Sequence, residues 1–327
     1  MANLSGVKVT VAGAGALGLA TALELARRGA AVTVFDPAES GDNASGVAAG
    51  MLAPASEAAL DPASAGHFEL LRHARDLWGD LADGIGLPID RSGAAYMGER
   101  LGEVAARMRS IGARVSLYGD RLLTPDDWRL SPRPALAALR AAATAEGVAF
   151  ETAEAPPGGP LVVATGAGGA GLAPELAHIE PIKGHILRLS GGPDTGPVLR
   201  GDGVYICPDA KGAAVGATME RGLADRSIDP AMVERLRRAA SDLLPELSGL
   251  DFRAETGVRA ATPDGLPMVG PSTAPGVIVA AGARRNGWLL APLVGQVVAA
   301  YLAGDDPGPY AARLDPRRFD NQTRGRA

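Results

Sequence analysis

The chain has 327 residues and a formal net charge of −5 at pH 7, a length that suits one large domain or two interleaved ones. Hydrophobic residues make up 46% of the chain and charged residues 21%, a balance that excludes a mainly disordered protein. The negative charge argues against nucleic acid or an anionic lipid surface as a partner.

The cysteine and histidine content argues against disulfides and metal sites. The single cysteine, Cys207, cannot close an intramolecular disulfide, and the four histidines are not spaced as metal ligands. The first residues lack the pattern of a secretory signal, and the longest apolar run, 288–303, is shorter than the roughly 20 residues of a membrane span. We therefore expect a soluble, cytoplasmic protein with no bound metal and no membrane span.

The chain opens with a strand, a helix and a second strand. Residues 7–12 form a short apolar run typical of a strand buried on both faces of a parallel sheet. Residues 16–28 place Leu17, Ala20 and Leu23 three positions apart, which predicts an amphipathic helix that stops at Gly29. Residues 31–35 predict the next strand. Such a βαβ unit implies parallel strands and a right-handed crossover.

The predicted secondary structure changes character twice along the rest of the chain. We predict helices over 65–83, 99–111 and 131–147, the last capped by Ser131, with an extended segment over 88–96 and a loop over 119–127. A buried strand at 161–164 precedes antiparallel strands between residues 182 and 219 and a helix over 230–244. A strand at 277–281 and a helix over 288–302 follow. An α/β layer thus brackets an α+β insertion.

A nucleotide-binding fingerprint lies between the first strand and the first helix. Gly13, Gly15 and Gly18 form GxGxxG, in which the first glycine allows the tight turn, the second lets a pyrophosphate approach and the third lets helix and strand pack. Asp36 ends the second strand, where a carboxylate accepts the ribose hydroxyls. These residues predict a dinucleotide without a 2′-phosphate, and they do not separate NAD from FAD. The chain has no GxSxG or GK[ST] motif, which argues against a hydrolase of that type and a P-loop NTPase.

Further motifs point to a flavoprotein family. SGVAAGMLAP (45–54), LVVATG (161–166), GATME (216–220), TPDGLP (262–267) and RNGWLLAP (285–292) follow one another along nearly the whole chain. In this order the sequence resembles the D-amino-acid oxidase family, and most closely its glycine oxidase branch, which supplies an imine for thiamine synthesis. The resemblance implies FAD, bound non-covalently because Cys207 lies away from the covalent flavin position of the related sarcosine oxidases.

The resemblance also implies the cofactor-binding residues. Some lie around the GxGxxG turn or hold the pyrophosphate, the ribityl chain and the flavin edge. Others form the turn over the adenosine, or the loop and helix start beside the flavin ring. Together they are Gly13, Gly15, Ala16, Gly18, Asp36, Ser45, Ala49, Gly50, Met51, Thr165, Gly166, Gly282, Asn286, Gly287, Trp288 and Leu289. The positive end of the helix that begins near Trp288 would favour the anionic reduced flavin.

For the substrate, the resemblance places Arg259, Arg285 and the Tyr205 hydroxyl at the carboxylate of an amino acid, and Met219 in apolar contact near the flavin. A guanidinium suits this role because its planar fork meets both carboxylate oxygens. Ala283 and Arg284 stand where the family commonly has His and an aromatic residue, so Arg284 is left to face solvent, pair with an acid or extend recognition to a more acidic substrate. The stretch 151–160 is short and Pro-rich, which predicts a more open adenine pocket.

The predicted fold is a Rossmann-type FAD-binding domain (1–80, 131–175 and 255–327) with an interleaved α+β substrate domain built on an antiparallel sheet (81–130 and 176–254). The predicted activity is FAD-dependent oxidation of glycine or another small amino acid or amine to the imine, then to the 2-oxo acid and ammonia, with oxygen reduced to hydrogen peroxide. Two alternatives stay open: a dehydrogenase that passes electrons to a quinone or a partner protein, and a flavin-loaded subunit without turnover. The oligomeric state also stays open.

Overall fold

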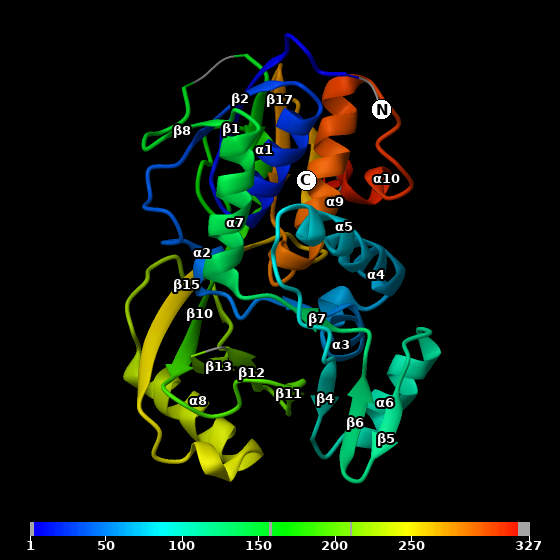
Figure 1. Cartoon of the computed structure of the whole chain (residues 1–327), viewed down its shortest axis with the longest axis vertical. Coiled ribbons are helices and arrows are strands. Elements are labelled where there is room, and N and C mark those ends of the chain that lie inside the picture. The colour runs from blue at the N-terminus through cyan, green and yellow to red at the C-terminus, as the bar shows by residue number, and fades with distance from the viewer. Residues whose placement is uncertain (1–2, 157–158, 210, 320–327) are drawn as a thin grey trace, which may run out of the picture.

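The computed structural model describes residues 3–156, 159–209 and 211–319 (Figure 1). Residues 157–158 of the short Pro-rich stretch lie outside the described residues, as do residues 1–2 and 320–327, at the two ends of the expected FAD-binding domain, and residue 210. Strands of the described part form a six-stranded sheet, a nine-stranded sheet and a small two-stranded sheet. No helix in this part of the chain is long and apolar enough to cross a bilayer.

The first sheet is parallel except at one edge. Its strands are, in spatial order, β16 (Met268–Pro271), β17 (Val277–Ala281), β9 (Leu161–Val163), β1 (Lys8–Ala12), β2 (Ala31–Phe35) and β8 (Ala149–Glu151), and β16 is the antiparallel one. The predicted βαβ unit is confirmed, with β1 and β2 in parallel register through Val9 and Val32. The helix between them, α1 (Ala16–Arg27), begins directly after Gly15, so the last three residues of the GxGxxG motif are helical.

Helix α1 is the centre of the main core. It packs against α9 (Gly287–Ala303) and α7 (Pro132–Ala145), and Leu19, Leu23 and Val294 are buried there. Each such side chain contributes on the order of 2 kcal/mol when removed from water. A Cβ at Gly295 would lie 3.1 Å from the carbonyl oxygen of Ala20, so a glycine here lets the two helices approach closely. This packing fixes the N-termini of α1 and α9 on the same side of the sheet.

The second sheet is mostly antiparallel, which confirms the predicted strands between residues 182 and 219. Its order is β14 (Glu220–Arg221), β10 (Glu180–Leu189), β13 (Gly212–Gly216), β12 (Tyr205–Asp209), β11 (Val198–Arg200), β4 (Ala94–Tyr96), β6 (Arg121–Thr124) and β5 (Ser116–Tyr118), and β15 (Phe252–Ala261) pairs with β10. Helix α8 (Pro230–Leu243) packs on β10 and β13. The predicted fold class, a Rossmann-type layer with an interleaved antiparallel α+β part, is confirmed.

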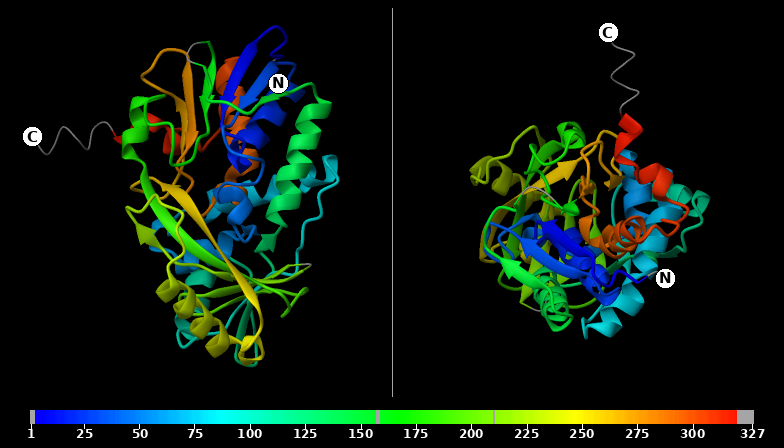
Figure 2. Two further views of the ribbon diagram at one scale, coloured as in Figure 1. Left: turned by 90° about the vertical axis from the view of Figure 1, so that its left-hand side faces the viewer. Right: turned by 90° about the horizontal axis from the view of Figure 1, so that it is seen from above.

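Strand β15 is the largest element that the sequence did not predict. It pairs with β10 over its full ten residues, from Glu180 opposite Ala261 to Leu189 opposite Phe252. Figure 2 shows the two strands side by side as a long twisted pair that runs from the first sheet to the second. The expected domain boundary at residue 255 falls inside this strand, because β15 belongs to the second sheet up to Ala261.

Three local predictions were wrong. The predicted loop over 119–127 contains β6, because the two residues Gly119 and Asp120 close a hairpin between β5 and β6 and Leu122 is buried. The predicted helix over 65–83 is two helices, α4 (Phe68–Asp76) and α5 (Trp78–Gly84), and the extended segment over 88–96 has strand geometry only at β4. Helix α6 (Leu101–Ser110) agrees with its prediction.

Short elements connect the two sheets near the GxGxxG turn. Helix α2 (Ala44–Val47), strand β3 (Met51–Leu52), which pairs with β7 (Trp128–Arg129), and helix α3 (Pro54–Leu60) follow β2 in the chain. A residue far away in sequence caps the N-terminus of α3: the carboxylate of Asp127 accepts the backbone N–H of Ala55 at 2.9 Å. The smaller helices are α10 (Ala311–Leu314) and the 3-10 turns η1 (Pro62–Ser64), η2 (Pro174–His178), η3 (Pro245–Leu247) and η4 (Pro316–Phe319).

Candidate active site

A cavity of about 560 Å³ runs between the first sheet and the strands β10, β12 and β15 of the second. Of the residues predicted to bind the cofactor, those that line this cavity are Gly13, Gly15, Ala16, Asp36, Ser45, Ala49, Gly50, Met51, Thr165, Gly166, Gly282, Asn286, Gly287 and Trp288. Gly18 and Leu289 do not line it. Gly18 lies against the backbone of Gly13, and Leu289 is fully buried in the main core.

The glycine turn forms one end of the cavity. Gly13 has φ +105°, a conformation that favours glycine, and a Cβ on it would lie 2.8 Å from the carbonyl carbon of Ala164. Asp36 accepts the backbone N–H of Ala14 at 2.7 Å through one carboxylate oxygen and that of Ala38 at 2.9 Å through the other. The turn therefore presents backbone and the positive N-terminus of α1 to the cavity, as a pyrophosphate requires.

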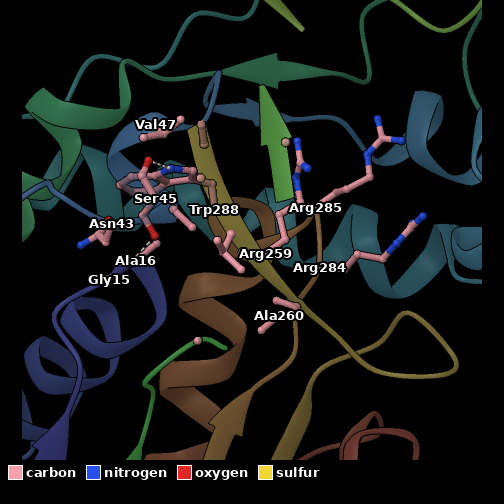
Figure 3. A pocket seen from close by; sticks show the side chains of 18 of the residues that line it. Gly15, Ala16, Asn43, Ser45, Val47, Arg259, Ala260, Arg284, Arg285 and Trp288 are labelled. Atoms are coloured by element: carbon pink, nitrogen blue, oxygen red, sulfur yellow. Dashed lines mark hydrogen bonds between the residues drawn. The ribbon is translucent and has the colours of Figure 1, made fainter. Parts of the chain in front are cut away.

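A second helix N-terminus faces the cavity from α9. Figure 3 shows Ser45 between the two helix starts: its Oγ accepts the backbone N–H of Ala16 at 3.0 Å, and its carbonyl oxygen accepts the indole N–H of Trp288 at 3.0 Å. The carbonyl oxygen of Trp288 in turn accepts the indole N–H of Trp78 at 2.8 Å. These bonds fix the starts of α1 and α9 relative to each other across the cavity.

Arg259 enters the cavity from β15 with one hydrogen bond and no carboxylate partner. Its Nη1 donates to the carbonyl oxygen of Thr218 at 3.2 Å, and among the described residues no carboxylate lies within 4 Å of its guanidinium. Burial lowers the pKa of Arg259 to about 10, and the nearby guanidinium of Arg285 adds to the lowering. Such a group attracts an anion, because a half-buried charge without an ion-pair partner has lost part of its hydration.

Tyr205 and Met219 line the same part of the cavity. Tyr205 lies on β12 opposite Gly216 of β13, and a Cβ at 216 would lie 2.6 Å from Cζ of the tyrosine ring. Burial raises the pKa of the Tyr205 hydroxyl above its ordinary value. Met219 lies in the segment between β13 and β14 and also lines the cavity. Because its pKa is raised, the Tyr205 hydroxyl keeps its proton at neutral pH and can donate a hydrogen bond.

Arg285 is held by a residue that the sequence analysis missed. Its Nη2 donates to Oε1 of Glu57 at 3.2 Å, and the same oxygen accepts Nη1 of Arg200 at 3.3 Å. Glu57 lies on α3 and Arg200 ends β11; both are almost fully buried and line the cavity. A lone carboxylate in the Ala-rich helix after GMLAP was the only local signal of Glu57. Nearness to Glu57 raises the pKa of Arg285.

Arg284 pairs with an acid, which decides among its three predicted environments. Its Nη1 forms an ion pair with the carboxylate of Asp61, and both side chains are largely buried. Its backbone has φ +51°, and its N–H donates to the carbonyl oxygen of Ala260 at 2.7 Å. Figure 3 shows the Arg284 side chain apart from those of Arg259 and Arg285. Asp61 therefore neutralises this guanidinium inside the protein.

A family model described as "FAD dependent oxidoreductase" matches residues 8–301 of the chain. The chain belongs to this family of FAD-dependent oxidoreductases. The glycine oxidase of Geobacillus kaustophilus is 30% identical over 89% of this chain and 91% of that protein. Its crystal structure superposes with a TM-score of 0.86 and 25% identity, over 95% of this chain and 99% of that one.

One similar protein matches over a shorter range. The glycine oxidase of Pseudomonas putida is 34% identical to the chain, but the match spans 41% of this chain and 39% of that protein. The resemblance to the D-amino-acid oxidase family and its glycine oxidase branch is thus confirmed by the family model and by the longer relatives.

FAD is the cofactor of this oxidoreductase, and the cavity fits it. The turn at Gly13 and Gly15 presents backbone where side chains would block a pyrophosphate, and two helix N-termini supply positive charge along the same cavity. Within the described ranges, no group of three or more His, Cys, Asp or Glu side chains is arranged to hold a metal ion.

Proposed function

We propose that the protein oxidises glycine or another small amino acid to its imine, which water converts to the 2-oxo acid and ammonia. The observation that carries this proposal is the guanidinium of Arg259, which has no carboxylate partner among the described residues and lies in the FAD cavity beside Tyr205. A substrate carboxylate would accept both prongs of that guanidinium and the hydroxyl hydrogen of Tyr205. The similarity to glycine oxidases supports the same substrate class.

The side chains mainly bind and orient the substrate. Bound FAD supplies the two-electron acceptor for the hydride that leaves Cα. Arg259 and Tyr205 fix the carboxylate, so that the Cα–H bond has one orientation in the cavity. The two guanidinium groups of Arg259 and Arg285 also disfavour the ammonium form of the substrate, and only the neutral amine releases a hydride. Met219 contributes an apolar wall.

The cofactor is proposed to be bound without a covalent link through cysteine. Cys207 is buried, its Sγ lies 3.4 Å from the carbonyl oxygen of Ala49, and it does not line the cavity. Burial also raises the pKa of its thiol to about 11, so the nucleophilic thiolate is disfavoured. The remaining cofactor residues are proposed to act as the family motif implies, with Gly13, Gly15 and Ala16 at the pyrophosphate and Gly282 to Trp288 beside the ring.

Oxygen is the proposed final acceptor, so that one amino acid, one oxygen and one water give one 2-oxo acid, one ammonia and one hydrogen peroxide. The test is to mix the purified yellow protein with glycine in air and to measure glyoxylate, ammonia and peroxide. We expect all three in equal amounts. Glyoxylate with little peroxide and rapid reduction of an artificial dye would instead identify a dehydrogenase. No product from any small amino acid, and no bleaching of the flavin without oxygen, would overturn the proposed function.

A further inference from the structure

The substrate end of the cavity contains more arginines than carboxylates. Of the described residues that line the cavity, five are arginines: Arg100, Arg200, Arg259, Arg284 and Arg285. Among the described residues, three carboxylates lie within ion-pair distance of these arginines: Glu57, Asp61 and Asp202.

The distribution of these pairs leaves Arg259 without an ion-pair partner among the described residues and Arg285 with a shared one. Asp61 pairs with Arg284, and Asp202 pairs with the exposed Arg100. Glu57 is shared by Arg200 and Arg285, and the buried carboxylate of Asp127 also interacts electrostatically with Arg200. Arg259 has none of the three as a partner. Glycine, with one carboxylate, would pair with Arg259 and add no partner to Arg285.

Arg285 also keeps unused hydrogen-bonding capacity. A single bond of 3.2 Å, from Nη2 to Oε1 of Glu57, is the hydrogen bond that its guanidinium makes with described residues, although a guanidinium has five N–H groups. Behind it, Oε2 of Glu57 and Nε of Arg200 are buried without a hydrogen-bond partner. Figure 3 shows the side chains of Arg259 and Arg285 extending toward the same end of the cavity. Both groups line the same cavity, and Arg285 is near enough to Arg259 to lower its pKa.

We infer that the preferred substrate carries two carboxylates: one is bound by Arg259 and Tyr205, and the other by Arg285. This inference rests on the proposed function, because it specifies the substrate class of the same site. A second carboxylate would give Arg285 a partner of its own, which glycine cannot supply. Two kinds of amine have this chemistry. The second carboxylate is either on the side chain, as in aspartate, or on the nitrogen, as in iminodiacetate.

The binding test avoids turnover. The oxidised FAD-loaded protein is titrated with malonate and with propionate, which has the same number of carbons and one carboxylate, at about 0.15 M salt so that long-range attraction is screened. The readout is the change in the visible flavin spectrum, with calorimetry as a check. We expect malonate to bind at least about tenfold more tightly. Equal or weaker binding of malonate would overturn the inference.

Two variants with opposite expected effects separate recognition from folding. Glu57→Gln removes the carboxylate that competes for Arg285 and is expected to raise the malonate-to-propionate affinity ratio. Arg285→Gln is expected to lower this ratio toward one. Arg238→Gln removes an equal charge at an exposed position outside the cavity, where Glu234 already neutralises it, so its ratio should stay within about twofold of wild type. A shift of the same sign in both site variants would contradict the inference.

The turnover test distinguishes the two sources of the second carboxylate. Flavin reduction without oxygen is compared within two pairs that differ only by a carboxylate in place of a methyl group: aspartate against 2-aminobutyrate, each enantiomer separately, and iminodiacetate against N-ethylglycine. We expect at least about a tenfold higher kcat/KM for the diacid in one pair. If glycine reduces the flavin and neither diacid is preferred, this inference fails and the proposed function stands. If no amine reduces the flavin, the proposed function fails as well.

Discussion

The guanidinium of Arg259 occupies the space that a side chain at Gly184 would need. A Cβ built on Gly184 would lie 2.7 Å from Cζ of Arg259, closer than real Cβ atoms approach a neighbour. The two residues lie on paired strands, where Gly184 stands opposite Gly257 and Arg259 stands opposite Ile182. They are thus diagonal neighbours on one face of the β10–β15 pair. The bare backbone at Gly184 lets the arginine lie flat against the strand and present its guanidinium to the cavity.

Replacement of Gly184 by alanine should therefore weaken substrate binding more than folding. The added methyl group pushes the guanidinium of Arg259 out of position, and we expect kcat/KM for glycine to fall about tenfold or more. Gly102→Ala is the matched control, because Gly102 lies in α6 with open space around its Cβ position. The control should keep its activity and gain up to about 1 kcal/mol of stability. Equal kcat/KM in wild type and Gly184→Ala would show that this contact does not position Arg259.

The distant cap on α3 should stabilise the segment that carries Glu57. Asp127 accepts the backbone N–H groups of Ala55 and Ser56 and is almost fully buried. Asp127→Ala leaves these donors without a partner, so we expect the free energy of unfolding to fall by about 1 to 3 kcal/mol. The measurement is urea denaturation. Asp120→Ala, at an exposed position, should stay within about 0.5 kcal/mol of wild type. An unchanged midpoint for Asp127→Ala would contradict the prediction.

The pH dependence should follow the substrate amine and not Tyr205. Burial raises the pKa of the Tyr205 hydroxyl above its ordinary value, so this hydroxyl loses its proton at a higher pH than an exposed tyrosine does. We expect kcat/KM for glycine to rise with pH as the neutral amine increases, and to level off toward pH 10 because Arg259, with a pKa of about 10, begins to lose its charge there. Tyr205→Phe should lower kcat/KM roughly fivefold, which corresponds to about 1 kcal/mol of lost transition-state stabilisation, and should leave the shape of the pH profile unchanged. A decline below pH 10 in wild type that disappears in the phenylalanine variant would show that Tyr205 ionises there.

Acid treatment should release the flavin. Because Cys207 does not line the cavity, we expect trichloroacetic acid to precipitate a colourless protein and to leave FAD in the supernatant. Absorbance of the redissolved pellet measures the fraction retained. A pellet that stays yellow would contradict non-covalent binding, and a Cys207→Ser variant treated in the same way would then show whether this thiol is the link.

The parts of this protein that the sequence predicts well are those with a local cause. The turn at Gly13 and the helix after it follow from glycine spacing and apolar periodicity within about thirty residues. Strand β15 was missed because Arg253, Glu255 and Arg259 interrupt its apolar pattern, so pairing with β10 forms the strand. The dipeptide Gly119-Asp120 between two short strands is a local signal of a two-residue hairpin, and the assignment of residues 119–127 as a loop overlooked it.

The site residues, too, divide into those that a sequence motif identifies and those that only the tertiary fold brings together. Arg259 and Tyr205 were identified only through family motifs, since a single arginine or tyrosine has no pattern of its own. Arg200 and Glu57 lie 143 residues apart, and only the tertiary fold brings them together. Neither residue stands in a motif that the sequence analysis used for the substrate, and Glu57 was therefore missed together with its partner.

The central claim is that Arg259 binds the substrate carboxylate beside FAD. The most direct measurement is anaerobic stopped-flow reduction of the flavin by glycine, and by the best diacid, in wild type and in Arg259→Gln at equal FAD content. We predict that the amino acid bleaches the flavin of the wild type. In the variant, the apparent dissociation constant of the amino acid, measured from the concentration dependence of flavin reduction, should rise by an amount that corresponds to about 2 to 4 kcal/mol of binding free energy. Identical reduction kinetics in the two proteins, or a wild-type flavin that no amino acid bleaches, would contradict the claim.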